Sequence, residues 1–351
     1  MNASSSLAPA MGAPRNSGCA RPRLGFLGVG WIGRNRLEAI ARSGVAEIAA
    51  VTDSISSVAM EVARNLPGAN APASFEALLH EPLDGLVIAT PSALHAEQSM
   101  AALERGLAVF CQKPLGRTGT ETRQVIEVAR RANRLLGVDL SYRHMKGVAP
   151  LRELIRSGQL GSIFAADLEF HNAYGPDKPW FYDRKFSGGG CVIDLGIHLI
   201  DLALWLLDFP RVTRVTSRLF AQGNPLRTGE RVEDFAVAIL ELQTGAVLEV
   251  RCSWKLHAGC DARIGAQFFG SKGGAGFRNV NGSFYDFVTE RFCGTHSQIL
   301  SEPPDAWGGR AAVAWARRLA EDRGFDPEIE ALIPVAETLD RIYSSAFEFC
   351  S

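Results

Sequence analysis

The chain has little of three things: an excess of one charge, paired cysteines and long apolar runs. Its 37 Lys and Arg residues offset 38 Asp and Glu, which leaves a net charge of −1 at pH 7 over 351 residues. Because no basic patch or lysine cluster stands out, we expect neither a nucleic acid nor an anionic membrane surface as a partner. The length suggests two domains with a sizeable core.

The cysteines and histidines show no metal-binding or disulfide pattern. The odd number of cysteines includes no C-x-x-C pair and favours free thiols in a reducing compartment; they are Cys19, Cys111, Cys191, Cys252, Cys260, Cys293 and Cys350. The seven histidines lack zinc spacing and an H-E-x-x-H motif. The sequence therefore predicts no bound metal.

Neither the N-terminal segment nor the longest apolar stretch is predicted to enter a membrane. Residues 1–21 are predicted to be a disordered tail, since they are rich in small and polar residues and lack the apolar core of a secretory signal. The apolar stretch 191–207 is too short for a span and contains three ionisable residues. We expect a soluble, cytoplasmic protein.

The region 22–141 alternates short apolar runs with helical patterns. Strands are predicted at 24–27, 47–52, 85–90, 108–111 and 135–140, and helices at 31–42, 58–65, 75–80, 92–106 and 118–137. This alternation predicts a doubly wound parallel sheet.

The region 142–351 has a different pattern and is predicted to be a second α/β domain. A helix at 148–157 and a strand at 162–171 precede the apolar helix. Further strands are predicted at 212–220, 234–242, 246–254 and 263–269, and helices at 311–321 and 327–347. Gly245 lies in a tight turn that indicates a hairpin. Strands without helices between them predict a mostly antiparallel sheet, open on one face.

A dinucleotide fingerprint follows the first predicted strand. Gly28, Gly30 and Gly33 form G-x-G-x-x-G at the start of a helix, where backbone N–H groups can bind a pyrophosphate. Asp53 follows twenty residues later at the end of the second strand, where an acid binds the ribose hydroxyls. This favours NAD, whereas Arg34 could accommodate the extra phosphate of NADP.

An ionisable stripe crosses the apolar helix at 191–207. Asp194, His198 and Asp201 are spaced i, i+4 and i+7, on one helical face. Burying a carboxylate beside an imidazole is costly unless the two groups pair, and sites that accept this cost are often catalytic. A structural Asp–His pair fits the helix alone equally well. Asp201 is assigned to structure.

Four segments together resemble the Gfo/Idh/MocA oxidoreductases, the family of glucose–fructose oxidoreductase and inositol 2-dehydrogenase. They are the glycine fingerprint, Ala89–His95, Val109–Leu115 and Gly188–Asp201. Their order and spacing match over almost the whole chain. The resemblance implies an N-terminal Rossmann domain, 22–141, and a C-terminal α/β domain, 142–351. In such proteins the open sheet often forms a homo-oligomer interface, so we expect a homodimer or homotetramer.

Three residues are predicted to carry the chemistry. Lys113 lies at the carboxyl edge of the sheet, where its ammonium can stabilise a developing alkoxide, and the resemblance implies that it is catalytic. His198 is the predicted acid/base, because its ordinary pKa is near neutrality. Asp194 would bind substrate or orient His198. The family's usual Glu-Lys-Pro reads Gln112-Lys113-Pro114 here, which removes a negative charge beside the lysine.

The predicted binding residues form two sets. The cofactor set is Gly28, Gly30, Trp31, Ile32, Gly33, Asp53, Thr90, Pro91, Ser92, His95 and Lys113. The substrate set is Lys113, Arg143, His171, Trp180, Asp194 and His198. His95 also fits a capping or packing role, and Arg143 a salt bridge between domains. Trp180 and His171 belong to a polar, aromatic loop of the kind that suits hydroxyl-rich ligands.

These features predict an NAD(P)-dependent oxidoreductase that acts on the carbinol or ketone of a sugar, sugar derivative or cyclitol. Two alternatives come from other functional classes. An NAD-dependent glycosidase would oxidise a sugar only transiently. A non-catalytic NAD-sensing regulator is disfavoured, because Lys113, Asp194 and His198 are all present.

Overall fold

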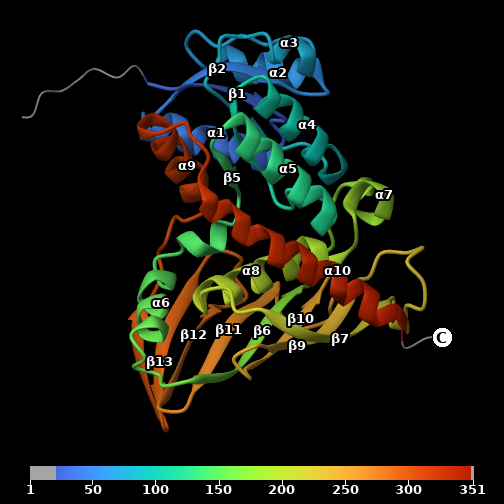
Figure 1. Cartoon of the computed structure of the whole chain (residues 1–351), viewed down its shortest axis with the longest axis vertical. Coiled ribbons are helices and arrows are strands. Elements are labelled where there is room, and N and C mark those ends of the chain that lie inside the picture. Colours follow the sequence, from blue (N-terminus) through green and yellow to red (C-terminus); the bar gives the residue numbers. More distant parts are fainter. Residues whose placement is uncertain (1–20, 349–351) are drawn as a thin grey trace, which may run out of the picture.

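The computed structural model describes residues 21–348 and contains two sheets, one above the other in Figure 1. The predicted N-terminal tail lies outside the described residues apart from Arg21. Both predicted sheet types are confirmed: a five-stranded parallel sheet is followed by a nine-stranded, mostly antiparallel one.

The first sheet has the strand order β2-β1-β3-β4-β5. Its strands are β1 (Arg23–Leu27), β2 (Glu47–Thr52), β3 (Gly85–Ile88), β4 (Ala108–Cys111) and β5 (Leu136–Val138). The helices between them are α1 (Trp31–Ser43), α2 (Ser56–Arg64), α3 (Phe75–Leu78), α4 (Ser92–Glu104) and α5 (Gly119–Ala132). The strand order reverses between β1 and β3, which is where open α/β sheets bind ligands.

Helix α5 ends earlier than the sequence predicts. The capping box is confirmed at its start, because the Thr118 side chain accepts from the Glu121 N–H. The expected end at Gly137 is wrong. Asn133 adopts a left-handed conformation with φ 49° and caps the helix four residues after Ala129, its last buried residue. Asparagine tolerates this conformation, so a glycine is not needed there.

The second sheet has the order β14-β13-β12-β11-β6-β10-β9-β7-β8. Its strands are β6 (Ile163–Asn172), β7 (Val212–Ala221), β8 (Asn224–Pro225), β9 (Phe235–Leu242), β10 (Val247–Ser253), β11 (Ala262–Gly270), β12 (Gly273–Asn279), β13 (Phe287–Cys293) and β14 (His296–Ser301). The hairpin at Gly245 is confirmed, since β9 and β10 pair antiparallel across it. One pair, β6 with β10, is parallel.

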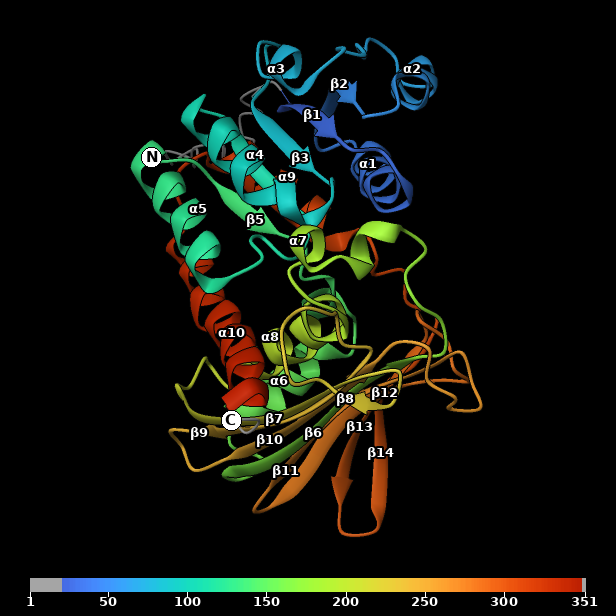
Figure 2. The same cartoon turned by 90° about the vertical axis from the view of Figure 1, so that its right-hand side faces the viewer.

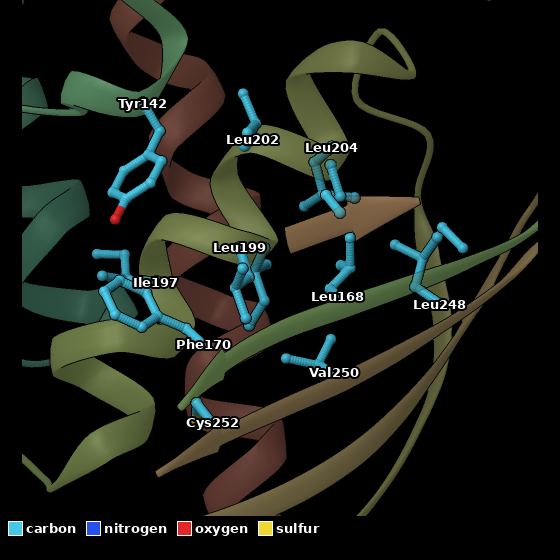
Figure 3. Close-up of a cluster of buried hydrophobic side chains, with 14 of the residues drawn as sticks. Tyr142, Leu168, Phe170, Ile197, Leu199, Leu202, Leu204, Leu248, Val250 and Cys252 are labelled. Carbon is cyan, nitrogen blue, oxygen red and sulfur yellow. The ribbon is translucent and has the colours of Figure 1, made fainter. Parts of the chain in front are cut away.

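Helices cover one face of this sheet. They are α6 (Val148–Arg156), α8 (Ile197–Leu206) and α10 (Leu332–Glu348), visible above the strands in Figures 1 and 2. Figure 3 shows Leu199 of α8 beside Leu168 and Phe170 of β6, with Val250 of β10 close by. All four side chains belong to one buried cluster, so α8 is anchored by its apolar faces.

The segment Arg184–Leu206 is long and apolar enough to cross a membrane by length and composition alone. Yet 83% of its most apolar window is buried inside the fold. Such burial is typical of the core helix of a globular domain. The segment includes the short helix α7 (Arg184–Ser187) and the π-helical turn Val192–Gly196, which leads directly into α8.

Helix α9 (Arg310–Glu321) differs from the predicted domain division. The sequence assigns all of 142–351 to the second domain. In the structure, Trp315 and Leu319 of α9 share a buried cluster with Phe26 of β1 and Phe110 of β4. The buried residues of α9 recur at helical spacing and form one apolar face that packs on the first domain; they are Ala311, Ala312, Trp315, Ala316 and Leu319. The chain therefore returns to complete the first domain.

Candidate active site

A cavity of about 490 Å³ lies between the two domains. The first domain contributes the loops at the carboxyl ends of β1, β3, β4 and β5, with Gly30, Trp31, Ile32, Arg36, Ala89, Thr90, Pro91, Ser92, His95, Gln112, Lys113, Pro114, Asp139 and Ser141. The second contributes Tyr142, Phe170, Pro176, Asp177, Lys178, Trp180, Phe181, Ser187, Ile193, Asp194, Leu195, His198, Phe284, Tyr285 and Trp307. Both predicted halves of the site thus meet at one cavity.

The glycine loop has the shape that a dinucleotide needs. Gly28 has φ 85°, and a Cβ there would come within 2.6 Å of the Ala89 carbonyl oxygen. A Cβ at Gly33 would come within 2.1 Å of the Gly28 oxygen, so only glycine lets α1 pack this closely. A Cβ at Gly30 would meet no atom within 4 Å. No side chain caps α1, which leaves its first N–H groups free for a phosphate.

Asp53 is bonded to the glycine loop itself. Its Oδ2 accepts the Val29 N–H at 2.8 Å, and its Oδ1 accepts the Ile55 N–H at 3.0 Å. The carboxylate thus joins the end of β2 to the fingerprint. Arg34, the candidate for an NADP phosphate, is 3.1 Å from Glu61.

Replacing Asp53 by alanine should weaken NAD binding and narrow the preference for NAD over NADP. The carboxylate orders the Val29 turn, and a negative charge there opposes a 2′-phosphate. Titration of both cofactors by calorimetry measures the change. Glu38→Ala, on the exposed side of α1, is the control. An unchanged NAD affinity in the Asp53 variant would contradict the assignment.

Lys113 and Asp194 meet across the domain interface. Lys113 Nζ donates to Asp194 Oδ1 at 2.5 Å and to the Asp194 carbonyl oxygen at 2.7 Å. The second carboxylate oxygen accepts from Trp254 Nε1 at 3.0 Å. Lys113 and Asp194 are each less than a fifth exposed. The ion pair is therefore held from both sides and faces the cavity.

His198 is half-buried and lines the same cavity, and no hydrogen bond joins it to Asp194 among the described residues. Its Nδ1 is buried and has no hydrogen-bond partner among residues 21–348. The Tyr142 ring packs against it, with centroids 5.0 Å apart. Burial lowers the His198 pKa well below its usual 6.5, and the charges of Lys113 and Arg36 add to the shift. The imidazole is consequently neutral and able to accept a proton.

The three residues of the predicted stripe do not all face the cavity. Asp194 lies in the π-helical turn and His198 in α8, and both line the cavity. Asp201 instead pairs with Arg143 and is almost fully buried. The wide turn changes the helical phase, and such turns are common at functional sites. Arg143 thus forms a salt bridge within the second domain and is not among the cavity-lining residues.

The remaining predicted residues fall inside and outside the cavity wall. His95 is buried, with Nδ1 2.7 Å from the Pro114 oxygen and Nε2 2.7 Å from the Thr90 oxygen, so it links two cofactor-side loops. Trp180 lines the cavity and stacks on Phe181, with centroids 3.8 Å apart. His171 does not line it; its Nδ1 lies 2.8 Å from Ser253 Oγ.

Sequence reasoning missed several polar residues of the site, among them Trp254, Arg36 and Asp139. Trp254 is far from Asp194 along the chain, and no pattern near it indicates the contact. Arg36 and Asp139 are joined in the cavity wall at 2.5 Å. Both had a signal: Arg36 lies about one helical turn after Gly33, and Asp139 follows the end of β5 much as Lys113 follows the end of β4.

We expect Trp254→Phe to lower kcat by at least about tenfold, since a hydrogen bond to a charged group is worth about 1.5–3 kcal/mol. Phenylalanine keeps an aromatic ring against Phe181 and Tyr182 but cannot donate to Asp194. Trp315→Phe is the matched control, because the Trp315 Nε1 has no hydrogen-bond partner in the described chain. Steady-state kinetics on both variants tests the role. Equal rates would assign Trp254 to packing alone.

The fold and the cavity define a two-domain enzyme with a dinucleotide-binding half. Residues 23–140 match the oxidoreductase family with an NAD-binding Rossmann fold, and residues 148–275 match the GFO/IDH/MocA C-terminal domain. The chain belongs to the Gfo/Idh/MocA family, as its four segments predict. It is an NAD(P)-dependent oxidoreductase of the dehydrogenase and reductase class.

Similar proteins span most of the chain. The D-glucoside 3-dehydrogenase of Escherichia coli (strain K12) is 30% identical over 241 residues, or 65% of this chain and 69% of that protein. Inositol 2-dehydrogenase 3 of Saccharopolyspora erythraea is 27% identical over 83% of this chain and 90% of its own. A levoglucosan dehydrogenase solved with NADH superposes with a TM-score of 0.80 at 22% identity, covering 94% and 98% of the two chains, and shows the shared fold.

Proposed function

We propose that this protein transfers a hydride between NAD and a secondary alcohol or ketone of a sugar, sugar derivative or cyclitol. One observation supports this above the others. Lys113 from the first domain and Asp194 and His198 from the second line one cavity beside the glycine loop. A donor for an alkoxide and a neutral base are the two groups that oxidation of a carbinol requires.

NAD, when bound, supplies the hydride acceptor. Lys113 donates to the substrate oxygen and stabilises its negative charge, at the expense of one of its bonds to Asp194. Trp254 keeps Asp194 in place during this exchange. His198, neutral and partner-free at Nδ1, accepts the hydroxyl proton through the imidazole. In the reverse direction the same groups return the proton.

The second-domain wall fits a ring with apolar C–H faces. Trp180, Phe181, Phe284 and Tyr285 line it together with only a few charged groups. Aromatic faces cover C–H patches of sugars, while Lys113 and its neighbours bind hydroxyls. The names of similar proteins, a D-glucoside 3-dehydrogenase and an inositol 2-dehydrogenase, support the same substrate class.

The assembly and the cofactor preference are part of the proposal. Among the described residues, helices cover one face of the nine-stranded sheet (Figure 2), and we assign the other face to a homodimer or homotetramer contact. NAD is preferred to NADP because Asp53 is fixed at the end of β2 and Arg34 is paired with Glu61.

A substrate screen tests the function. Purified protein is incubated with NAD or NADP and with hexoses, alkyl and aryl glycosides and cyclitols, while NADH absorbance is followed and products are analysed. We expect NADH to accumulate with at least one carbohydrate. Release of an aglycone without net NADH would instead identify an NAD-dependent glycosidase. NAD binding with neither reaction would favour a sensor.

A further inference from the structure

A buried charged network forms the wall of the cavity next to Lys113. Asp139, at the end of β5, accepts at Oδ2 from Arg36 Nε and from Gln112 Nε2, each at 2.5 Å. Its Oδ1 accepts from Ser141 Oγ, which Arg36 also reaches at 3.0 Å. All four side chains are at most 8% exposed, and all four line the cavity.

The network requires an amide at position 112. Asp139 forms an ion pair with Arg36, in which its carboxylate oxygens act only as hydrogen-bond acceptors. Gln112 provides a hydrogen-bond donor, its side-chain N–H, that an ionised glutamate lacks. A glutamate there would set two carboxylates 2.5 Å apart in a buried wall, and one of them would have to take up a proton. Gln112, which stands in place of the glutamate of Glu-Lys-Pro, is thus complementary to the Asp139 carboxylate at the end of the neighbouring strand.

The same network fixes the backbone position from which the Lys113 side chain extends toward the second domain. The backbone fixes Gln112 through its N–H to the Ile88 oxygen at 2.9 Å, and Asp139 through its N–H to the Cys111 oxygen at 2.9 Å. The side-chain bond from Gln112 to Asp139 then joins the ends of β4 and β5 on the cavity side. Lys113 is the next residue, and its Nζ must meet Asp194 across the interface.

We infer that Asp139 is a positioning residue that acts on Lys113 through Gln112, with Arg36 as its counter-ion. The inference rests on the proposed catalytic part of Lys113. It requires that positions 112 and 139 hold one amide and one carboxylate. The amide and the carboxylate can therefore be exchanged between the two positions. Two amides or two carboxylates, in contrast, should lower kcat.

A charge-exchange cycle tests this. Gln112→Glu duplicates the carboxylate and Asp139→Asn duplicates the amide, and each should lower kcat by about tenfold or more. The double variant Gln112→Glu/Asp139→Asn should return kcat to within about threefold of wild type, because coupled sites are not additive. Multiplication of the two single losses in the double variant would overturn the inference.

Two further measurements separate positioning from stability and from cofactor loss. Asp201→Asn is the matched control, since Asp201 is an equally buried carboxylate paired with Arg143 away from the cavity; it should lower the melting temperature and leave kcat unchanged. NADH affinity, followed by fluorescence, should stay near wild type in all variants. If the network variants behave like Asp201→Asn, the network is structural only.

Folding and activity failures give distinct results. If Gln112→Glu does not fold but the double variant does, the coupling is shown by folding itself. If neither folds, Asp139→Asn decides: loss of kcat with NADH affinity retained supports the inference, and an unchanged kcat refutes it. A wild-type protein that binds NADH but oxidises no carbohydrate would instead refute the proposed function, and the recovery of melting temperature in the double variant would still report on the pairing.

Discussion

Lys113→Ala should lower kcat by about 10²–10³ while NAD binding stays close to wild type, because loss of one donor to a developing oxyanion has about that cost. The lysine contacts Asp194 rather than the glycine loop, so the cofactor site keeps its shape. Steady-state kinetics with the best substrate of the screen, together with calorimetric titration of NAD, measures both quantities.

Lys272→Ala provides the control for that experiment. Lys272 lies in the exposed turn between β11 and β12, far from the cavity-lining set. It should have wild-type kinetics. If the Lys113 variant also turns over at the wild-type rate, the ammonium has no part in the chemistry, and the ion pair with Asp194 serves only to join the domains.

His198→Asn should lower kcat by about 10²–10⁴, the usual contribution of a general acid or base. Burial, with help from Lys113 and Arg36, lowers the His198 pKa well below 6.5. In the oxidation direction the base must be neutral, so kcat/KM should fall as pH decreases through that lowered pKa and be flat through neutrality. The sequence alone places this ionisation near neutral pH; the buried position moves it to the acid side. The variant should lose the acid limb.

The stability of the same variant has its own pH dependence. A histidine with a lowered folded-state pKa contributes stability above the unfolded value of about 6.5, and the contribution is lost as pH falls below it. His198→Asn should therefore be less sensitive to acid unfolding than wild type. His144→Asn, at a half-buried histidine outside the cavity, is the control for kcat. A variant with reduced stability but normal kcat per folded molecule would make His198 structural.

Local patterns predicted the first domain well because its strands are short, apolar and buried on both faces. Strands β2 and β4 have the predicted bounds, Glu47–Thr52 and Ala108–Cys111. The strands β12, β13 and β14 were missed. β12 reads Gly273-Gly274-Ala275-Gly276, which has low intrinsic strand preference, and β14 is largely exposed. Their strand structure depends on pairing with neighbours, which a local pattern does not contain.

The residues of the site also divide into those that local patterns predict and those that depend on long-range contacts. Lys113, Asp194 and His198 stand out because each is an ionisable residue in an apolar run or at a strand end. The Trp254 contact and the pairing of Asp139 with Arg36 join segments 60 and 103 residues apart. No local pattern in the sequence indicates that these distant residues come into contact. Only the packing of the sheets brings them together.

The return of α9 to the first sheet determines the order in which the chain can fold. While the protein is being synthesised, the strands β1 to β5 are complete long before Trp315 and Leu319 exist. The apolar surface that Trp315 covers beside Phe110 stays exposed throughout the synthesis of the second domain, and such a surface favours aggregation. A fragment ending at residue 141 should therefore be poorly soluble, and adding a peptide of residues 310–321 should rescue it.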